Sequence, residues 1–138
     1  MAARPPVMKR IETTLKQSLP EAEAAVRRAL MAEGFGILTE IDVAATLEAK
    51  LGVRRTPLKI LGACNPAIAH RALELDPSLV LVLPCNVALE EVGGGSTFVA
   101  VADPRSMLGG RDRSTAELLT LGEDAARILQ RAIEQLAG

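Results

Sequence analysis

The fold is decided by the stretch from Ile60 to Glu91, ILGACNPAIAHRALELDPSLVLVLPCNVALEE, which holds both cysteines, the only histidine and the longest apolar run. It begins within a short apolar strand, Pro57 to Cys64. Asn65-Pro66 is then typical of a helix N-cap followed by proline at the first helical position. Asp76-Pro77 ends this helix. The apolar, β-branched run from Ser78 to Glu91 predicts a central strand.

Before this stretch the sequence predicts two strands, each followed by a helix. Residues 1–6 are expected to form a loose tail, and residues 7–14 a first strand. Ser18 and Glu21 match the S-x-x-E pattern of a capped helix, which Gly34 would end. The apolar residues of this helix recur on one face: Leu19, Ala22, Val26, Ala29 and Leu30.

Residues 35–41 predict a second strand, and residues 42–52 a short helix capped by Asp42 and stopped by Gly52. In that strand Phe35, Ile37, Thr39 and Ile41 would share one face, and Gly36, Leu38 and Glu40 the other.

A hairpin and a long helix are predicted after Glu91. The glycines at 93–95 favour a turn into a fifth strand, 96–103, which should pair antiparallel with the fourth. In the long C-terminal helix, Gly122 indicates a bend or a close contact. The core-facing side of that helix is predicted to consist of Leu118, Leu121, Ala125, Ile128, Leu129, Ala132 and Leu136.

This order of elements predicts a single α+β domain over residues 1–138. It would have two layers, with a five-stranded mixed, mostly antiparallel sheet, helices on one face and a long C-terminal helix. A chain of 138 residues can bury a sufficient core without a cofactor, so none is assigned.

Composition and charge exclude several classes of function. The net charge is -1 and aromatic residues make up 1% of the chain, so the sequence lacks the basic face and stacking aromatics of a nucleic-acid binder. The apolar run at 79–89 is too short to span a bilayer, so no membrane segment is expected. Two cysteines without a signal peptide predict a cytoplasmic protein.

Strand alternation predicts which side chains face the core. On the fourth strand Cys85 would face it, and Asn86 the opposite side. On the third strand Cys64, with Leu58 and Ile60, would face the core, and Lys59, with Leu61 and Ala63, the opposite side. Both thiols would therefore lie under the helices.

The opposite face would mix charged and apolar residues. Its polar members would be Arg10, Glu12, Glu40, Lys59, Asn86 and Glu90, and its apolar members Leu38, Leu61, Ala63, Val82 and Ala88. A sheet face of this kind usually meets a partner subunit or a ligand. The sequence therefore favours a homodimer, with a small-molecule cleft at its interface as an addition. The candidate ligand-binding residues are Asn86, Glu40, Lys59 and Asn65.

The competing hypothesis is a thiol-based redox or soft-metal protein. Cys64 precedes a helix N-terminus, which lowers the pKa of a thiol, and Cys85 would be its partner. His70 could complete a set of soft-metal ligands with both cysteines. The plainer interpretation is that the cysteines pack in the core, that His70 lies on an exposed helix flank, and that Asn65 is a cap.

No catalytic motif is recognised. The glycines at 93–95 lie between two strands rather than before a helix, so they indicate a hairpin and not a phosphate loop. The chain has no G-x-S-x-G elbow and only one histidine, so the sequence does not favour a Ser-His-Asp catalytic triad. No catalytic residue and no metal ligand set is assigned, and a binding role is favoured over an enzymatic one.

Two motifs resemble the bacterial and archaeal family called domain of unknown function 302. They are Ala63-Cys64-Asn65-Pro66 with Ala69, and Leu83-Pro84-Cys85-Asn86-Val87. The resemblance covers nearly the whole chain. It implies an α+β fold of the TATA-box-binding-protein-like group, with a curved antiparallel sheet and a long C-terminal helix, and a homodimer. It implies neither nucleic-acid binding nor any catalytic role for the motif residues.

Overall fold

The computed structural model describes residues 9–108 and 115–137, so the expected tail at 1–6 and the start of the first strand lie outside the described residues. The strands are β1 (Arg10–Leu15), β2 (Gly36–Asp42), β3 (Leu58–Cys64), β4 (Cys85–Gly93) and β5 (Ser96–Ala102). They form one sheet in the order β1-β5-β4-β3-β2. All four neighbouring pairs are antiparallel, including the predicted β4–β5 hairpin.

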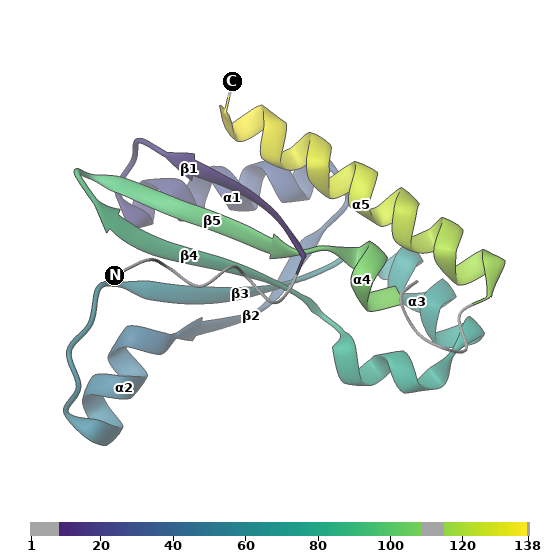
Figure 1. Ribbon diagram of the computed structural model, residues 1–138, viewed down its shortest axis with the longest axis horizontal. Coiled ribbons are helices and arrows are strands. Elements are labelled where there is room, and N and C mark those ends of the chain that lie inside the picture. Colours follow the sequence, from purple (N-terminus) through teal and green to yellow (C-terminus); the bar gives the residue numbers. More distant parts are fainter. Residues whose placement is uncertain (1–8, 109–114, 138) are drawn as a thin grey trace.

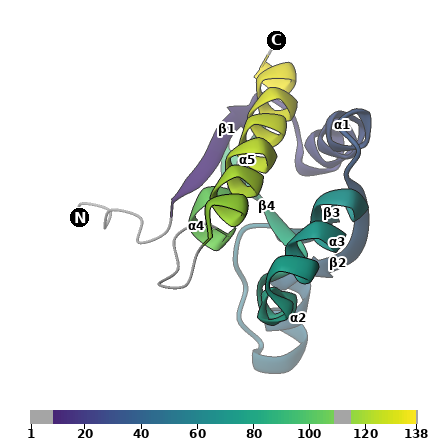
Figure 2. The ribbon, with the colours of Figure 1, turned by 90° about the vertical axis from the view of Figure 1, so that its right-hand side faces the viewer.

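Helices lie on both sides and at one end of this sheet (Figure 1). They are α1 (Leu19–Ala32), α2 (Val43–Leu51), α3 (Pro66–Leu75), the 3-10 helix η1 (Pro77–Val82), α4 (Pro104–Leu108) and α5 (Ala116–Ala137). Figure 2, which looks roughly along the strands, shows α1 and α5 on one side of the sheet and α2 on the other. The two-layer α+β prediction is confirmed, with α2 as an addition on the second side.

The local signals for α1 are confirmed. The Ser18 hydroxyl accepts from the backbone N–H of Glu21 and donates to the Glu21 carboxylate at 2.9 Å. At the other end Gly34 adopts a φ of 85°, which lets the N–H of Phe35 donate to the carbonyl of Leu30. The buried residues of α1 are the five that its periodicity predicts: Leu19, Ala22, Val26, Ala29 and Leu30.

The main core lies between the sheet and the helices α1 and α5. Its largest fully buried side chains include Leu30, Leu61, Leu89, Val99 and Leu129. A second, smaller cluster joins α3, η1, α4 and α5 at the end of the sheet, with Ala72, Leu79, Leu108 and Leu118 buried. The close contact predicted at Gly122 is found, because a Cβ there would lie 3.1 Å from the carbonyl oxygen of Pro104.

The predicted strand from Ser78 to Glu91 is wrong over its first half. Asp76 caps η1 by accepting from the N–H of Ser78 at 3.0 Å, and β4 begins only at Cys85. The apolar run follows a helical rather than an alternating pattern, because Leu79 is fully buried while the next residues, Val80 and Leu81, are exposed.

The predicted orientation of β3 is also wrong. Leu61 pairs with Val87 and Ala63 with Cys85, so both face the helices, where they are fully buried. Leu58 and Ile60 alternate with them and belong to the opposite face, whereas Cys64, the last residue of the strand, lines a cavity with Cys85. The prediction failed because it treated Lys59 as the mark of a polar face. Lys59 instead lies under α1, where carboxylates neutralise it.

A bulge at Leu38 reverses the second half of β2. Ile37 pairs with Ala63, but Thr39 pairs with Gly62, so Leu38 is an extra residue. Glu40 therefore shares the helix-covered face with Ile37, and Thr39 and Ile41 lie on the other. The predicted shared face for Ile37, Thr39 and Ile41 does not exist beyond the bulge.

Candidate functional site

The two sequence motifs meet where the end of β3 lies beside the start of β4. Ala63 pairs with Cys85, and Gly62 with Asn86. The residues that follow β3 begin α3, and those that precede β4 leave η1. The motifs therefore form one corner of the sheet, which we call the motif corner: residues 62–66 and 83–86.

Cys64 and Cys85 both line a small cavity behind the motif corner. Its walls come from β3, α3, β4, α4 and α5, and apart from the thiols they are almost wholly apolar. The cavity has a volume of about 20 Å³, room for about one water-sized atom. Burial, and to a lesser extent the nearby Cys64, raises the pKa of the Cys85 thiol to about 11. Cys85 is therefore protonated at neutral pH.

Asn65 has a structural role in the motif corner. Its side-chain oxygen accepts from the N–H of Ile68 at 3.2 Å, which makes it the N-cap of α3 as predicted. Its side-chain nitrogen lies 3.1 Å from the position that a Cβ of Gly34 would occupy. Asn65 thus connects the start of α3 to the turn after α1.

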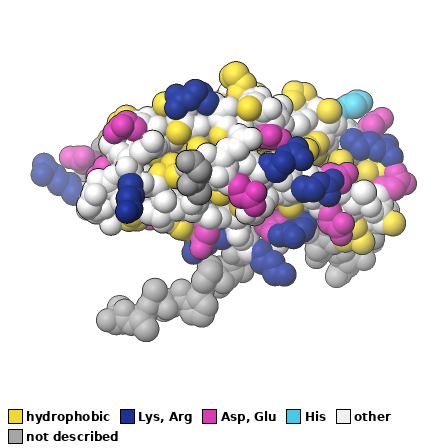
Figure 3. All heavy atoms as spheres, turned by 90° about the horizontal axis from the view of Figure 1, so that it is seen from above, with side chains coloured by type: hydrophobic (Ala, Val, Ile, Leu, Met, Phe, Trp, Pro, Cys, Tyr) yellow, Lys and Arg dark blue, Asp and Glu magenta, His cyan; other side chains and the backbone are white. Residues whose placement is uncertain are grey.

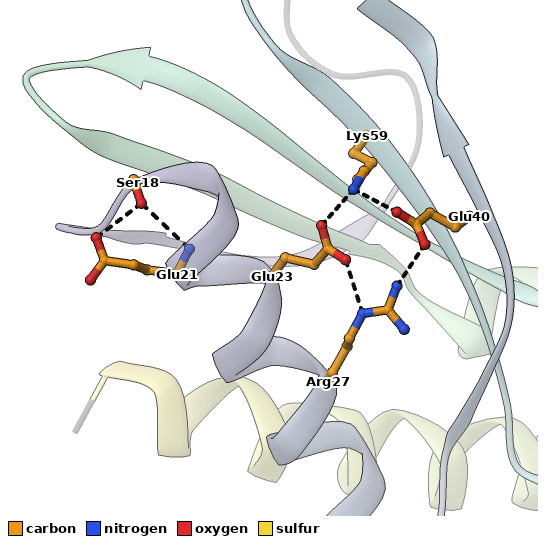
Figure 4. A network of polar contacts seen from close by, with 6 residues as sticks. All are labelled: Ser18, Glu21, Glu23, Arg27, Glu40 and Lys59. Atoms are coloured by element: carbon orange, nitrogen blue, oxygen red, sulfur yellow. Dashed lines mark hydrogen bonds and ion pairs between the residues drawn. The ribbon is translucent and has the colours of Figure 1, made fainter. Parts of the chain in front are cut away.

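Glu40 and Lys59 are brought together, but in a closed ring of charges with two residues of α1 (Figure 4). The Lys59 ammonium lies 2.8 Å from Glu23 and 2.6 Å from Glu40. The Arg27 guanidinium lies 2.9 Å from Glu23 and 3.1 Å from Glu40. Each carboxylate uses one oxygen for each cation, so the ring fastens α1 to β2 and β3 and leaves neither oxygen of Glu40 unpaired.

The pKa values of the ring follow from these contacts. The hydrogen bond from Lys59 holds the pKa of Glu40 below its ordinary 4.5. The hydrogen bonds to Glu23 and Glu40 raise the pKa of Lys59 above 10.5. Because its pKa is lowered, Glu40 stabilises the fold fully above its ordinary pKa and loses this effect as the pH falls through the lowered pKa. Because its pKa is raised, Lys59 keeps its stabilising effect until the pH rises through the raised pKa, in strong alkali. The ring is therefore intact between these limits.

We expect Lys59→Met to lower the free energy of unfolding at pH 7 by about 2 kcal/mol, because it leaves two carboxylates sharing one cation. Urea unfolding measures this loss. The difference from the unmodified chain should shrink as the pH falls below 4.5 and through the lowered pKa of Glu40, where that carboxylate becomes protonated. Arg54→Met is the control, because its ion pair with Glu48 is exposed and should contribute less than about 0.5 kcal/mol. Equal losses for both variants would contradict a structural role for the ring.

Asn86 lies on the face of the sheet that α1 and α5 leave uncovered. In the row across the strands Thr39 pairs with Gly62, and Gly62 with Asn86. The hydroxyl of Thr39 and the ring of Pro84 occupy the space over Gly62. Asn86 is exposed and, among the residues that the structure describes, has no side-chain hydrogen bond. Asn86 and Glu40, which the sequence placed together, therefore lie on opposite faces.

We call this uncovered side the open face. Register and alternation assign to it Arg10, Glu12, Thr14, Thr39, Ile41, Leu58, Ile60, Gly62, Asn86, Ala88, Glu90, Phe98, Ala100 and Ala102. Its centre is apolar and only half-buried, and its charges pair within the chain, Arg10 with Glu12 and Arg55 with Glu90. The Arg10 guanidinium also lies 5.3 Å above the ring of Phe98.

The helix α2 covers only one side of the open face. Its main contacts are with β3, and it has no buried residue. A helix of nine residues is only marginally stable alone. The sequence predicted α2 and its caps, Asp42 and Gly52, but the pattern gave no sign that its apolar residues would stay uncovered.

His70 does not join the cysteines. It is exposed on α3 and lies 3.8 Å from Glu74. In the described part of the chain no three histidine, cysteine or acidic side chains are grouped so that they could hold a metal ion. On the helix-covered side acidic and basic side chains are intermixed (Figure 3). None of the described helices is long and apolar enough to cross a membrane.

Sequence reasoning missed Glu23, Arg27, Thr39 and Gly62. A four-residue spacing of Glu23 and Arg27 on a helix suggests an ion pair, but nothing in the sequence indicates that this pair would meet Lys59. Gly62 is a single glycine inside a strand, which is a known signal for a close approach.

Comparison with known proteins agrees with this architecture. A family model described as Domain of unknown function DUF302 matches residues 11–136. The crystal structure of an uncharacterized conserved protein DUF302 from Bacillus stearothermophilus superposes with a TM-score of 0.84 at 24% identity, covering 94% of this chain and 99% of that one. No curated protein matches.

Proposed function

Since the chain belongs to the DUF302 family, a family of unknown function, we propose from the structure that it acts as a homodimer joined through the open face. The observation that carries this proposal is the apolar centre of that face. Ala88, Phe98 and Ala100 are half-exposed there, on a side of the sheet that none of the described helices covers over β1, β5 and β4. A second layer would bury them, as in packed sheets.

The charges of the open face fit a second copy rather than a strongly charged partner. Its acidic and basic residues are paired with each other, so the surface has no excess of either sign to attract a polyanion or a polycation. A two-fold dimer brings the same patch of both copies together, which requires a surface that does not repel itself.

Asn86 is the residue through which this homodimer would hold a small polar molecule. The exposed Asn86 side chain has no hydrogen-bond partner among the described residues, and an amide that a dimer interface buries needs such partners. In a dimer it would pair across the interface or with a molecule enclosed beside Thr39. We also place the protein in the cytoplasm, because both cysteines are free thiols.

We expect light scattering to give a mass of twice the 14.6 kDa of the chain. Ala100→Arg should reduce the mass to that of one chain, because it puts a long charged side chain into the apolar centre. Leu119→Arg is the control, because Leu119 is an exposed apolar residue of α5, on the helix-covered side, and it should leave the mass unchanged. A monomeric unmodified chain would refute the homodimer.

The thiol-based alternative depends on the reactivity of Cys85. Because its pKa is raised to about 11 from 9.0, we expect its thiolate fraction at neutral pH to be about 100-fold below that of an ordinary cysteine. Titration of the native Cys64→Ser variant with a chromogenic disulfide should therefore be slow and become fast on unfolding. Cys85→Ser reports Cys64 in the same assay. Rapid reaction of Cys85 in the native variant would favour the redox hypothesis instead.

A further inference from the structure

Three sulfur-bearing side chains from separate segments border the cavity behind the motif corner. Besides Cys64 at the end of β3 and Cys85 at the start of β4, its lining includes Met107 of α4. In Figure 1 these segments lie at the same end of the sheet, next to α3. The sequence indicated His70 as the companion of the two thiols, whereas the structure brings Met107 to them instead.

The register of the sheet keeps the two thiols close to each other. Ala63 pairs with Cys85, and Cys64 is the next residue of β3. Neighbouring strands lie about 5 Å apart and rise about 3.3 Å per residue, so Cα atoms one residue out of register are about 6 Å apart. Both side chains border the same cavity rather than opposite faces of the sheet. Two thiols at this spacing can share one metal ion.

The lining of the cavity suits a soft metal ion with few ligands. Apart from the sulfur-bearing residues, Asn65 is the one polar side chain among the described lining residues, and its oxygen already accepts from the N–H of Ile68. These residues include no imidazole to complete a four-ligand zinc site and no carboxylates for magnesium or calcium. Thiolate and thioether sulfur are the ligands that favour copper(I).

We infer that Cys64, Cys85 and Met107 form a copper(I) site. The ion displaces the protons of both thiols, which pass to the solvent, and it binds the two thiolates and the thioether. Met107 has an unbranched, flexible side chain, so its sulfur can adjust to an ion that the thiolates hold. All three residues are partly exposed, which gives the ion a way in from the solvent. The cavity lies among β3, β4 and the helices α3, α4 and α5, away from the open face, so the site does not depend on the proposed homodimer.

The start of α3 would stabilise the charge of this site. Two thiolates and one copper(I) ion carry one negative charge in surroundings that are otherwise apolar. Asn65, the residue after Cys64, is the N-cap of α3, which has ten residues. The positive end of the helix dipole therefore lies next to Cys64, where it favours the thiolate over the thiol.

The first test is a competition for copper(I) under anaerobic conditions. The full chain is added to the coloured copper(I) complex of bicinchoninate, so that transfer of the ion to the protein bleaches the colour. We expect the chain to take up one ion, and Cys64→Ala and Cys85→Ala each to abolish the transfer. Met107→Leu keeps the side-chain volume and should lower the affinity by about 10-fold or more. Met31→Leu is the matched control, because Met31 is 72% exposed on α1, and it should leave the affinity unchanged. Circular dichroism checks that each variant is folded.

X-ray absorption at the copper edge then identifies the ligands, and for the unmodified chain it needs no variant to fold. We expect three sulfur ligands in the unmodified chain, and two sulfur ligands at shorter copper–sulfur distances in Met107→Leu. Failure of the unmodified chain to take up copper(I), or uptake that persists in Cys64→Ala, would overturn the site. Equal affinities for Met107→Leu and Met31→Leu, or a nitrogen ligand that disappears in His70→Ala, would also overturn it, because the third ligand would not be Met107.

Discussion

Leu61→Ala should lower the free energy of unfolding by about 3 kcal/mol, whereas Ile60→Ala should lower it by about 1 kcal/mol or less. The two neighbours have side chains of equal size but occupy opposite faces of β3. Leu61 has no exposed surface and packs in the main core, while Ile60 is half-exposed on the open face. Removing three carbon atoms leaves a cavity in the first case, and in the second a gap that solvent can fill.

Urea unfolding of both variants measures the difference, at a protein concentration low enough to keep the chains monomeric. Val87→Ala, opposite Leu61 in the register, is a second probe of the same layer and should also be costly. A larger loss for Ile60→Ala than for Leu61→Ala would reverse the orientation of β3 and remove the basis for the open face.

Gly62→Ala is expected to destabilise the fold by about 2 kcal/mol through overpacking. A Cβ at this position would lie 2.1 Å from the Thr39 hydroxyl oxygen and 2.8 Å from the Pro84 ring. The hydroxyl can rotate away, but the ring is part of the backbone path into β4. Part of the cost therefore cannot be avoided by a change of rotamer.

A double variant separates the two contacts. Thr39→Ala combined with Gly62→Ala should recover the part due to the hydroxyl and leave the part due to Pro84. Gly36→Ala is the matched control, because it is another strand glycine and a Cβ there would meet nothing within 4 Å. Its thermal midpoint should be unchanged. If Gly36→Ala and Gly62→Ala have equal effects, the close approach does not determine the residue at 62.

Sequence patterns predicted the elements better than they predicted the faces. The periodicity of α1 identified all its buried residues because a helix facing one core has a single apolar stripe. The sequence also predicted the β4–β5 hairpin and most of the order of the elements correctly. In β4 the alternation of Cys85, Val87 and Leu89 against Asn86 was correct, because Val87 and Leu89 are fully buried on one face while Asn86 is exposed on the other.

The faces of β2 and β3 could not be predicted because two features that override alternation leave no local trace. One is the ring of charges, which lets Lys59 lie on the core side. The other is the extra residue at Leu38, which reverses the strand beyond it. The candidate site inherits both errors, since it joined Glu40 and Lys59 to Asn86 on one face.

The bulge at Leu38 has a consequence for how large an assembly can become. Strand β2 is an edge strand of the sheet. A regular edge strand offers its unpaired backbone N–H and C=O groups to another molecule, so chains can polymerise through it without limit. The extra residue breaks the regular spacing of those groups along β2. At the other edge of the sheet, on β1, Arg10 and Glu12 place charges beside the backbone of any strand that would pair there. Growth sideways is thereby discouraged, and association through the broad surface of the sheet would stop once that surface is occupied.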